Sequence, residues 1–173
     1  IEPIVEPMSH ILVPDSYFVR EVLRNGKEVY SMSRDELTRQ AVENIYWLAR
    51  EYLAGAEDNL TDHPRLAVDA AYNAAELCAK AFLLLDGVER LPTRHGATIR
   101  LFSDRFLKTE RLPSRLGREV NRALDERNRA RYQFEVDITH DTAQKVVSLA
   151  RELLEHLQEH LTVEAQETSA QTA

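Results

Sequence analysis

The stretch from Asp62 to Gly87, DHPRLAVDAAYNAAELCAKAFLLLDG, decides the fold. Pro64 suits the first turn of a helix, where its missing N–H costs nothing, and Gly87 suits the position just past a helix end. Between them, small and apolar residues recur at helical spacing and predict one broad buried face: Ala67, Ala70, Ala71, Ala74, Leu77, Cys78, Ala81, Leu84 and Leu85. Because so many of these residues are alanine, neighbouring helices can approach closely. An all-α fold is therefore expected around this helix.

Four further segments carry the helical period. Ser33 and Glu36 have the spacing of a capping box, which starts a helix, and an apolar stripe continues it to about Ala56: Leu37, Ala41, Ile45, Leu48 and Tyr52. A shorter helix is predicted over about 96–107, and two long ones are predicted from about Pro113 to Tyr132 and over about 139–161. Short connections between such helices predict an antiparallel four- to five-helix bundle spanning 33–162.

Both ends of the chain depart from this pattern. A β-like run over 1–5, helical spacing over 16–24 and an extended stretch at Val29 and Tyr30 predict a strand–helix–strand appendage over 1–32. The polar segment 163–173 is expected to be a disordered tail. The first residue is Ile1 rather than Met, which fits either a trimmed start or the C-terminal piece of a longer protein.

Composition narrows the class of protein. Of 173 residues, 43% are hydrophobic and 29% are charged, which is a globular balance. The single cysteine, Cys78, excludes an intramolecular disulfide and a cysteine-based zinc cluster. No apolar run is long enough for a membrane span, and no signal peptide is evident at the start. We expect a cytoplasmic protein that uses no metal and no cofactor; the pair His156 and His160 is interpreted as surface residues rather than a metal site.

Charge is distributed unevenly. The chain has a net charge of −7, yet residues 88–132 hold twelve Lys or Arg against six Asp or Glu, and eleven of the twelve are arginine. Arginine offers a planar fork of donors that matches phosphate. The bias therefore predicts a phosphate-binding face, or else a solvated face that pairs with the acidic remainder of the bundle.

Arg127 is the most unusual residue of this basic stretch. It follows Ala123 by four residues and Val120 by seven, which places it on the apolar face of its helix. A charge there is costly unless it is paired or solvated in a cleft. Two interpretations stay open: Arg127 pairs with Glu76 or Glu43 and fixes the bundle, or it lines a phosphate-binding groove with Arg131 and Tyr132.

Several local patterns resemble those of HEPN domains, in particular the small prokaryotic HEPN proteins. The resemblance spans about 33–161 and rests on the following features: Tyr72 in its alanine-rich flank, the run 81–85, Arg94-His95-Gly96 before Ile99 and Phe102, Phe106-Leu107-Lys108 before Leu112-Pro113, and the segment from Arg127 to Tyr132. It implies a homodimer, often encoded beside a minimal nucleotidyltransferase as a toxin–antitoxin pair. It also implies, for many members, metal-independent RNase activity through an Arg followed a few residues later by a His.

The catalytic part of the family pattern is incomplete after Arg127. Tyr132 and Gln133 occupy the window in which the histidine is expected. Tyrosine titrates near pH 10 and is a poor general base near neutrality. We therefore predict a nucleotide- or RNA-binding module whose ligand contacts Arg127, Asn128, Arg131, Tyr132, Arg94 and His95. The alternative is a metal-independent RNase toxin with an atypical site built from Arg127 and Tyr132.

The N-terminal segment carries a second resemblance. The order of Phe18 to Leu23, Asn25-Gly26 and Val29-Tyr30 is similar to the C-terminal end of a minimal nucleotidyltransferase domain. The resemblance implies a nucleotidyltransferase partner in cis or in trans. The metal-binding carboxylates and the Gly-Ser motif of such a catalyst are absent from this sequence, so the chain is not expected to transfer a nucleotide unaided.

Overall fold

The computed structural model describes residues 17–26 and 33–171. The chain divides into two compact units, Ile1–Ser33 and Arg34–Ala173.

The first unit contains helix α2 (Tyr17–Asn25). It ends as the sequence predicts, with the Gly26 N–H donating to the carbonyl of Val22 at 2.7 Å. The described residues are all-helical and include no strand, so the predicted strand–helix–strand appendage is wrong as a fold assignment. The two stretches predicted as strands, 1–5 and Val29 with Tyr30, lie outside the described residues.

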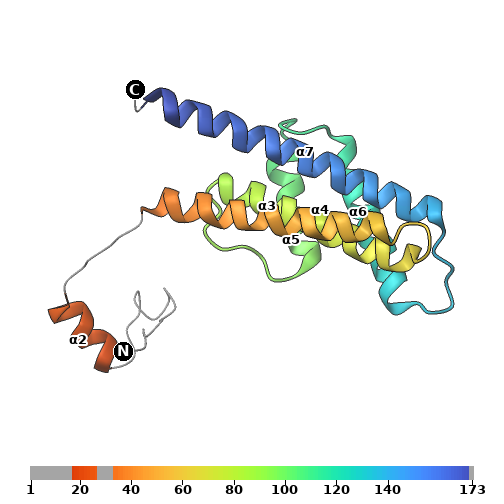
Figure 1. Ribbon diagram of the computed structural model, residues 1–173, viewed down its shortest axis with the longest axis horizontal. Coiled ribbons are helices and arrows are strands. Elements are labelled where there is room, and N and C mark those ends of the chain that lie inside the picture. The colour runs from red at the N-terminus through yellow and green to blue at the C-terminus, as the bar shows by residue number, and fades with distance from the viewer. Residues whose placement is uncertain (1–16, 27–32, 172–173) are drawn as a thin grey trace. The chain divides into compact units, whose positions relative to one another are not determined.

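The second unit is a helical bundle, which confirms the predicted architecture of this part of the chain. Figure 1 shows its elements: α3 (Arg34–Asp58), α4 (Pro64–Leu85), α5 (His95–Phe102), the π-helix η1 (Ser103–Leu107), α6 (Arg115–Tyr132) and α7 (His140–Gln171). The helix predicted over 96–107 is therefore α-helical only to Phe102 and continues as a π-turn. The sequence predicts a disordered tail over 163–173, whereas α7 continues to Gln171.

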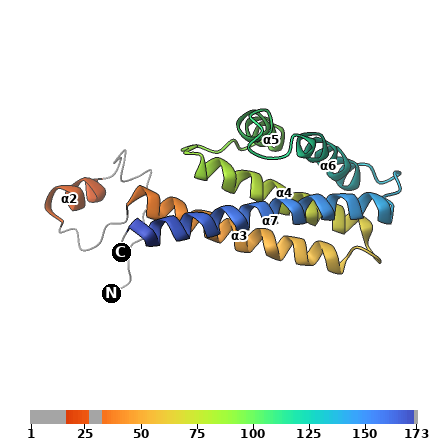
Figure 2. The ribbon, with the colours of Figure 1, turned by 90° about the horizontal axis from the view of Figure 1, so that it is seen from above.

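Helix α4 is the centre of the bundle and packs against α3, α5, α6 and α7. Figure 2 shows α5 and α6 on one side of α4 and α3 on the other, with α7 running along α4. Helices α3 and α4 run in opposite directions, as do α6 and α7. This arrangement brings the C-terminal half of α6 against α4, where the candidate site lies.

Small side chains explain this central position. Residues on α4 are buried on almost every side, including Ala71, Ala74, Ala75, Ala79 and Ala81, none of which has any exposed surface. Alanine lets a neighbouring backbone approach without leaving a cavity, so four elements can pack on one helix. Cys78 lies in the same face and is fully buried, and burial raises the pKa of its thiol to about 12, as expected of a cysteine in the core.

The ends of α4 follow the sequence prediction. Pro64 is the first helical residue. At the other end Gly87 has a φ of +77°, while the Val88 N–H donates to Leu83 and the Gly87 N–H donates to Leu84. These two bonds form a Schellman motif, in which glycine is favoured because its φ is positive.

The apolar stripe that was predicted as the buried face of α3 is only partly buried. Leu37, Leu48 and Tyr52 are about 40% exposed (40%, 43% and 38%). The face of α3 in the core is instead formed by Val42, Ala49, Leu53 and Ala56. Both stripes have helical period, and periodicity alone does not say which one meets α4. The outer stripe is thus an apolar surface that the second unit covers only in part. None of the helices in the described part of the chain is long and apolar enough to span a membrane.

Candidate functional site

Arg127 lies on the buried face of α6 with Leu116, Val120, Ala123 and Ala130. Its exposed fraction is 3%, so the inward orientation expected from the helical phase is observed. A buried guanidinium loses its hydration and must find partners within the protein. The residues that surround Arg127 therefore define the candidate site.

The ion-pair partner of Arg127 is Asp69 of α4, and neither of the predicted carboxylates. Nε of Arg127 lies 3.4 Å from Oδ1 of Asp69. Both atoms are buried, yet neither makes an aligned hydrogen bond to any described residue, so the contact is a Coulomb attraction rather than a fork-to-fork pair. The other oxygen of Asp69 accepts from Arg131 at 3.2 Å. One carboxylate thus serves both arginines of the same row of α6.

Glu76, one of the predicted partners of Arg127, binds His95 instead. Its Oε2 lies 2.6 Å from Nδ1 of His95, and Lys80 approaches its other oxygen at 3.4 Å. Glu76 is 5% exposed, whereas the His95 side chain is 43% exposed. A buried carboxylate therefore holds a half-exposed imidazole at the start of α5.

His95 also meets Arg127. Nε2 of the imidazole lies 3.5 Å from Nη2 of Arg127. A guanidinium can only donate, so a hydrogen bond in this contact has Nε2 as the acceptor and leaves Nδ1–H for Glu76. A histidine distant in sequence thus stands beside the arginine, although none follows Arg127 at the family spacing.

Two tyrosines flank the guanidinium. The Arg127 Cζ lies 5.8 Å from the ring centroid of Tyr72 and 5.8 Å from that of Tyr132. Tyr72 is fully buried, and its hydroxyl has no hydrogen-bond partner within the described protein. Burial, with a further contribution from Glu76, raises the pKa of Tyr72 well above its usual range, while Arg127 opposes the shift. Tyr132 is 67% exposed and ends α6.

We refer to Asp69, Tyr72, Glu76, Lys80, His95, Arg127 and Arg131 as the Arg127 cluster. It has three permanent cations against two carboxylates, so it carries net positive charge even when His95 is neutral. The predicted residues Asn128 and Tyr132 contact it, since Asn128 accepts from Arg127 at 3.2 Å and the Tyr132 ring packs on Arg127. Arg94 is exposed and precedes His95 as the N-cap of α5, without a described contact to the cluster.

Sequence reasoning did not assign Asp69 or Lys80 to the site. Asp69, Tyr72, Glu76 and Lys80 are spaced at three to four residues along α4. That spacing places them on one face of an otherwise alanine-rich helix. A polar row on the helix predicted to be most buried is a signal that could have located the site.

Two other arginines precede a histidine at the spacing of the family pattern, Arg90 before His95 and Arg151 before His156. The second pair lies on α7, where five residues rotate the side chain by about 140°. Arg151 pairs with Glu57 at 2.6 Å, while His156 faces Glu152 and Glu159. The two therefore do not converge on one site. Arg90 is exposed and has no described contact to the cluster.

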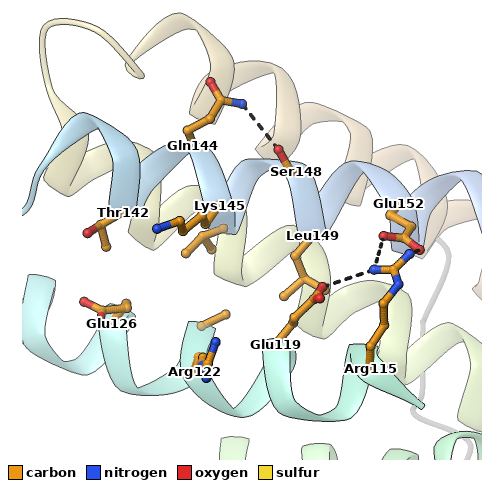
Figure 3. A pocket seen from close by; sticks show the side chains of 12 residues that line it. Arg115, Glu119, Arg122, Glu126, Thr142, Gln144, Lys145, Ser148, Leu149 and Glu152 are labelled. Atoms are coloured by element: carbon orange, nitrogen blue, oxygen red, sulfur yellow. Dashed lines mark hydrogen bonds and ion pairs between the residues drawn. The ribbon is translucent and has the colours of Figure 1, made fainter. Parts of the chain in front are cut away.

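A recess of about 540 Å³ lies elsewhere on α6, between α6 and α7. Its floor includes Ala123 and Leu149, and Figure 3 shows Arg115 bridging the two helices from one end. Arg115 donates to both oxygens of Glu152 and to Glu119, which raises the pKa of Arg115 further. The charges that close this end of the recess form hydrogen-bonded ion pairs, whereas Nε of Arg127 and Oδ1 of Asp69 lack an aligned hydrogen bond among the described residues.

Removing the Tyr72 hydroxyl tests directly whether this buried group is unpaired. An unpaired buried hydroxyl costs about 1–3 kcal/mol, so Tyr72→Phe should raise the free energy of unfolding of the free protein by about 1 kcal/mol. Urea denaturation measures it, with Tyr52→Phe on the exposed stripe of α3 as the control expected to change little. A loss of stability in Tyr72→Phe would contradict the description of an unpaired hydroxyl.

Comparison with known proteins agrees with this architecture. A family model of the HEPN domain matches residues 42–160, which include all the helices that form the Arg127 cluster. A search of curated proteins finds no match. HEPN domains are generally nucleotide- or RNA-binding or RNase modules. The matched range covers well over half of the chain, and the protein belongs to the HEPN domain family.

Proposed function

We propose that the Arg127 cluster binds a phosphate group of a nucleotide or an RNA, and that the chain acts as a HEPN-type binding module. The observation that supports this proposal is the incomplete pairing of Arg127. Its guanidinium is buried, its Nε has no hydrogen bond, and its carboxylate is shared with Arg131. A phosphate would supply the aligned acceptors that Asp69 does not.

Access to Arg127 runs past the exposed side chains of the site. Arg131 and His95 are roughly half exposed (46% and 43%), and both are adjacent to the buried guanidinium. Tyr132 is 67% exposed and its ring centroid lies 5.8 Å from Cζ of Arg127, and in this proposal the ring moves aside to admit the ligand. In this proposal Arg131 and Arg94 attract the phosphate, Arg127 fixes it, and Tyr132 closes over it with Asn128 beside it.

A second candidate, metal-independent RNA cleavage, is supported by one observation. A carboxylate-oriented histidine beside an arginine has the parts of a general base and an electrostatic stabiliser. Glu76, His95 and Arg127 have this arrangement, with successive contacts of 2.6 and 3.5 Å. In this candidate His95 rather than a tyrosine transfers the proton, because a tyrosine side chain is a poor general base near neutrality.

The proposed partner and biological system rest on the family resemblance. We propose that the module works with a minimal nucleotidyltransferase, in cis or in trans, in a toxin–antitoxin-like system. The unit Ile1–Ser33, which resembles the end of such a transferase, supports a covalent link, with the HEPN-like bundle over 33–162 as the binding part.

We also propose a homodimer formed through the outer stripe of α3. Leu37, Leu48 and Tyr52 are apolar, aligned along one helix and partly exposed. A second copy of the same stripe would bury them by a two-fold contact, the commonest symmetry of homo-oligomers.

Phosphate binding predicts a specific response to salt. Arg131→Ala should weaken the binding of a fluorescein-labelled single-stranded RNA several-fold and lower the slope of log affinity against log salt by about one. Fluorescence anisotropy at several salt concentrations measures both quantities. Arg118→Ala is the matched control, because Arg118 is an exposed arginine of α6 outside the cluster. Equal affinity and slope in the two variants would refute the assignment.

Binding without cleavage is the expected outcome when RNA is incubated with the protein in EDTA. The described cluster holds one histidine, whose Nδ1 contacts Glu76, whereas acid–base cleavage of RNA also needs a second group that titrates near neutrality. Gel electrophoresis of the RNA reads the result. Cleavage by the wild type that His95→Gln abolishes and Arg118→Ala retains would establish the second candidate instead.

The dimer proposal predicts that Leu48→Glu yields a monomer, because a carboxylate on the stripe cannot be buried without a partner. Light scattering after size-exclusion chromatography gives the mass of each variant. The control is Ala54→Glu, which adds the same charge at an exposed position on another face of α3. A dimeric Leu48→Glu protein, or a monomeric wild type, would exclude this interface.

A further inference from the structure

We propose that a cavity near the C-terminal end of α4 binds a small aromatic carboxylate, that is, a planar ring that carries one carboxylate group. The cavity has a volume of about 250 Å³ and is lined by α4, by η1 with the turn that follows it, and by α7: Phe82, Phe106, Arg111, Leu112, His156, Glu159 and His160. None of these residues belongs to the Arg127 cluster, so this inference does not rest on the proposed function.

The inner wall of the cavity is aromatic. The ring centroids of Phe82 and Phe106 lie 5.3 Å apart, and Phe102 supports both rings from behind at 5.9 and 5.5 Å. The His160 ring meets Phe82 edge-on at 6.0 Å. Aromatic rings pair favourably by such offset and edge-to-face contacts. Since an apolar cavity of about 150 Å³ admits benzene, a volume of about 250 Å³ leaves room for one such ring and a small substituent.

The turn 108–112, which follows the π-helix η1, forms a second wall. Glu110 has a φ of 60°, a conformation that is uncommon for residues other than glycine. The chain reverses there, and the Leu112 N–H donates back to the carbonyl of Phe106 at 3.1 Å. This reversal places Arg111 over the Phe106 ring, with Cζ 4.2 Å from the ring centroid. The backbone thus places a cation at the edge of the aromatic wall.

Arg111 supplies donors that fit a carboxylate. Its Nη1 donates to Asp86 at 2.5 Å, and Arg105 donates to the other oxygen of Asp86 at 2.9 Å. These hydrogen bonds hold the pKa of the Asp86 carboxyl below its usual range, so two cations share one ionised carboxylate. Among the described residues Arg111 donates only through Nη1. The Nε–H and Nη2–H groups of a guanidinium lie side by side and match the two oxygens of a carboxylate.

Helix α7 contributes two imidazoles on the side of the cavity opposite the turn. His156 and His160 are four residues apart and therefore lie on the same side of the helix. The nitrogens of His156 lie 3.6 Å from Glu152 and 3.5 Å from Glu159. Glu159 is the one carboxylate that lines the cavity, and its side chain is 77% exposed. Water therefore screens its charge, while the imidazoles can donate to a ligand oxygen.

An aromatic carboxylate meets both halves of this lining. Its ring would be buried against Phe82 and Phe106, and its two oxygens would accept from the free donors of Arg111. An apolar ring without the carboxylate leaves these donors in water, and a carboxylate without the ring leaves the aromatic wall unfilled. Binding should therefore require both groups in one molecule.

The experiment titrates the protein with benzoate and follows the imidazole signals by NMR spectroscopy, with His156→Ala and His160→Ala to assign them. Benzoate should shift the signals of His156 and His160 and leave the signal of His95 unchanged. Arg111→Gln should weaken benzoate binding about tenfold, because a hydrogen bond to a charged group is lost. Arg118→Gln is the matched control, because Arg118 is an exposed arginine outside this cavity. Benzamide, which keeps the ring without the charge, and acetate, which keeps the charge without the ring, should both bind more weakly than benzoate.

Several outcomes would overturn the inference. One is a titration in which the His156 and His160 signals do not shift, and another is a shift confined to His95, which would place benzoate at the Arg127 cluster. Wild-type affinity in Arg111→Gln, or equal affinity for benzamide and benzoate, would exclude the carboxylate contact. Thermal denaturation shows whether Arg111→Gln is folded. If it is not, His156→Ala decides, because benzoate binding should weaken in that variant and unchanged binding would overturn the inference.

Discussion

The close approach of other helices to α4 is the constraint on which the rest of this structure depends. Ala71, Ala74, Ala75 and Ala79 are fully buried, and a larger side chain at these positions would force the neighbouring helices apart. The same packing brings α6 against the polar row of α4. The alanine face therefore stabilises the bundle and also places Arg127 beside Asp69, Tyr72 and Glu76.

The charged residues of the cluster are difficult to explain by stability alone. Replacing a buried ion pair by apolar residues of similar size is often neutral or stabilising, whereas removing one partner costs about 3–5 kcal/mol. Arg127 is buried although its carboxylate partner is poorly aligned, and the buried Tyr72 hydroxyl has no hydrogen-bond partner among the described residues. Unsatisfied polar atoms gathered around one cation are typical of a site prepared for a ligand.

The features of the fold that depend on residues close together in the sequence, such as helix ends and buried helix faces, could be predicted. Pro64 and Gly87 marked the ends of α4, and the spacing from Val120 to Arg127 predicted a buried arginine. The predicted strands at the N-terminus were wrong as a fold assignment, because short apolar runs have no period that distinguishes them from other structures. On α3 two stripes have helical period. Packing against the other helices buries Val42, Ala49 and Leu53 and leaves the more regular stripe partly exposed.

Long-range contacts of the site could not be predicted in this way. His95 reaches Glu76 across nineteen residues and Arg127 across thirty-two, so no spacing rule relates them. In the sequence, the positions after Arg127 at which a histidine is expected hold Tyr132 and Gln133. The structure adds a histidine from the start of α5, oriented by a buried carboxylate, and this changes which chemistry the cluster can support.

The most direct test of the central claim is the shift in thermal denaturation midpoint on adding single-stranded RNA, compared between wild type and Arg127→Met. A ligand that binds the native state raises the midpoint. The account predicts a rise for wild type and none for Arg127→Met, with a smaller rise for Arg127→Lys, which keeps the charge but loses the planar fork. An equal rise in all three proteins would show that Arg127 is a structural residue and would contradict the account.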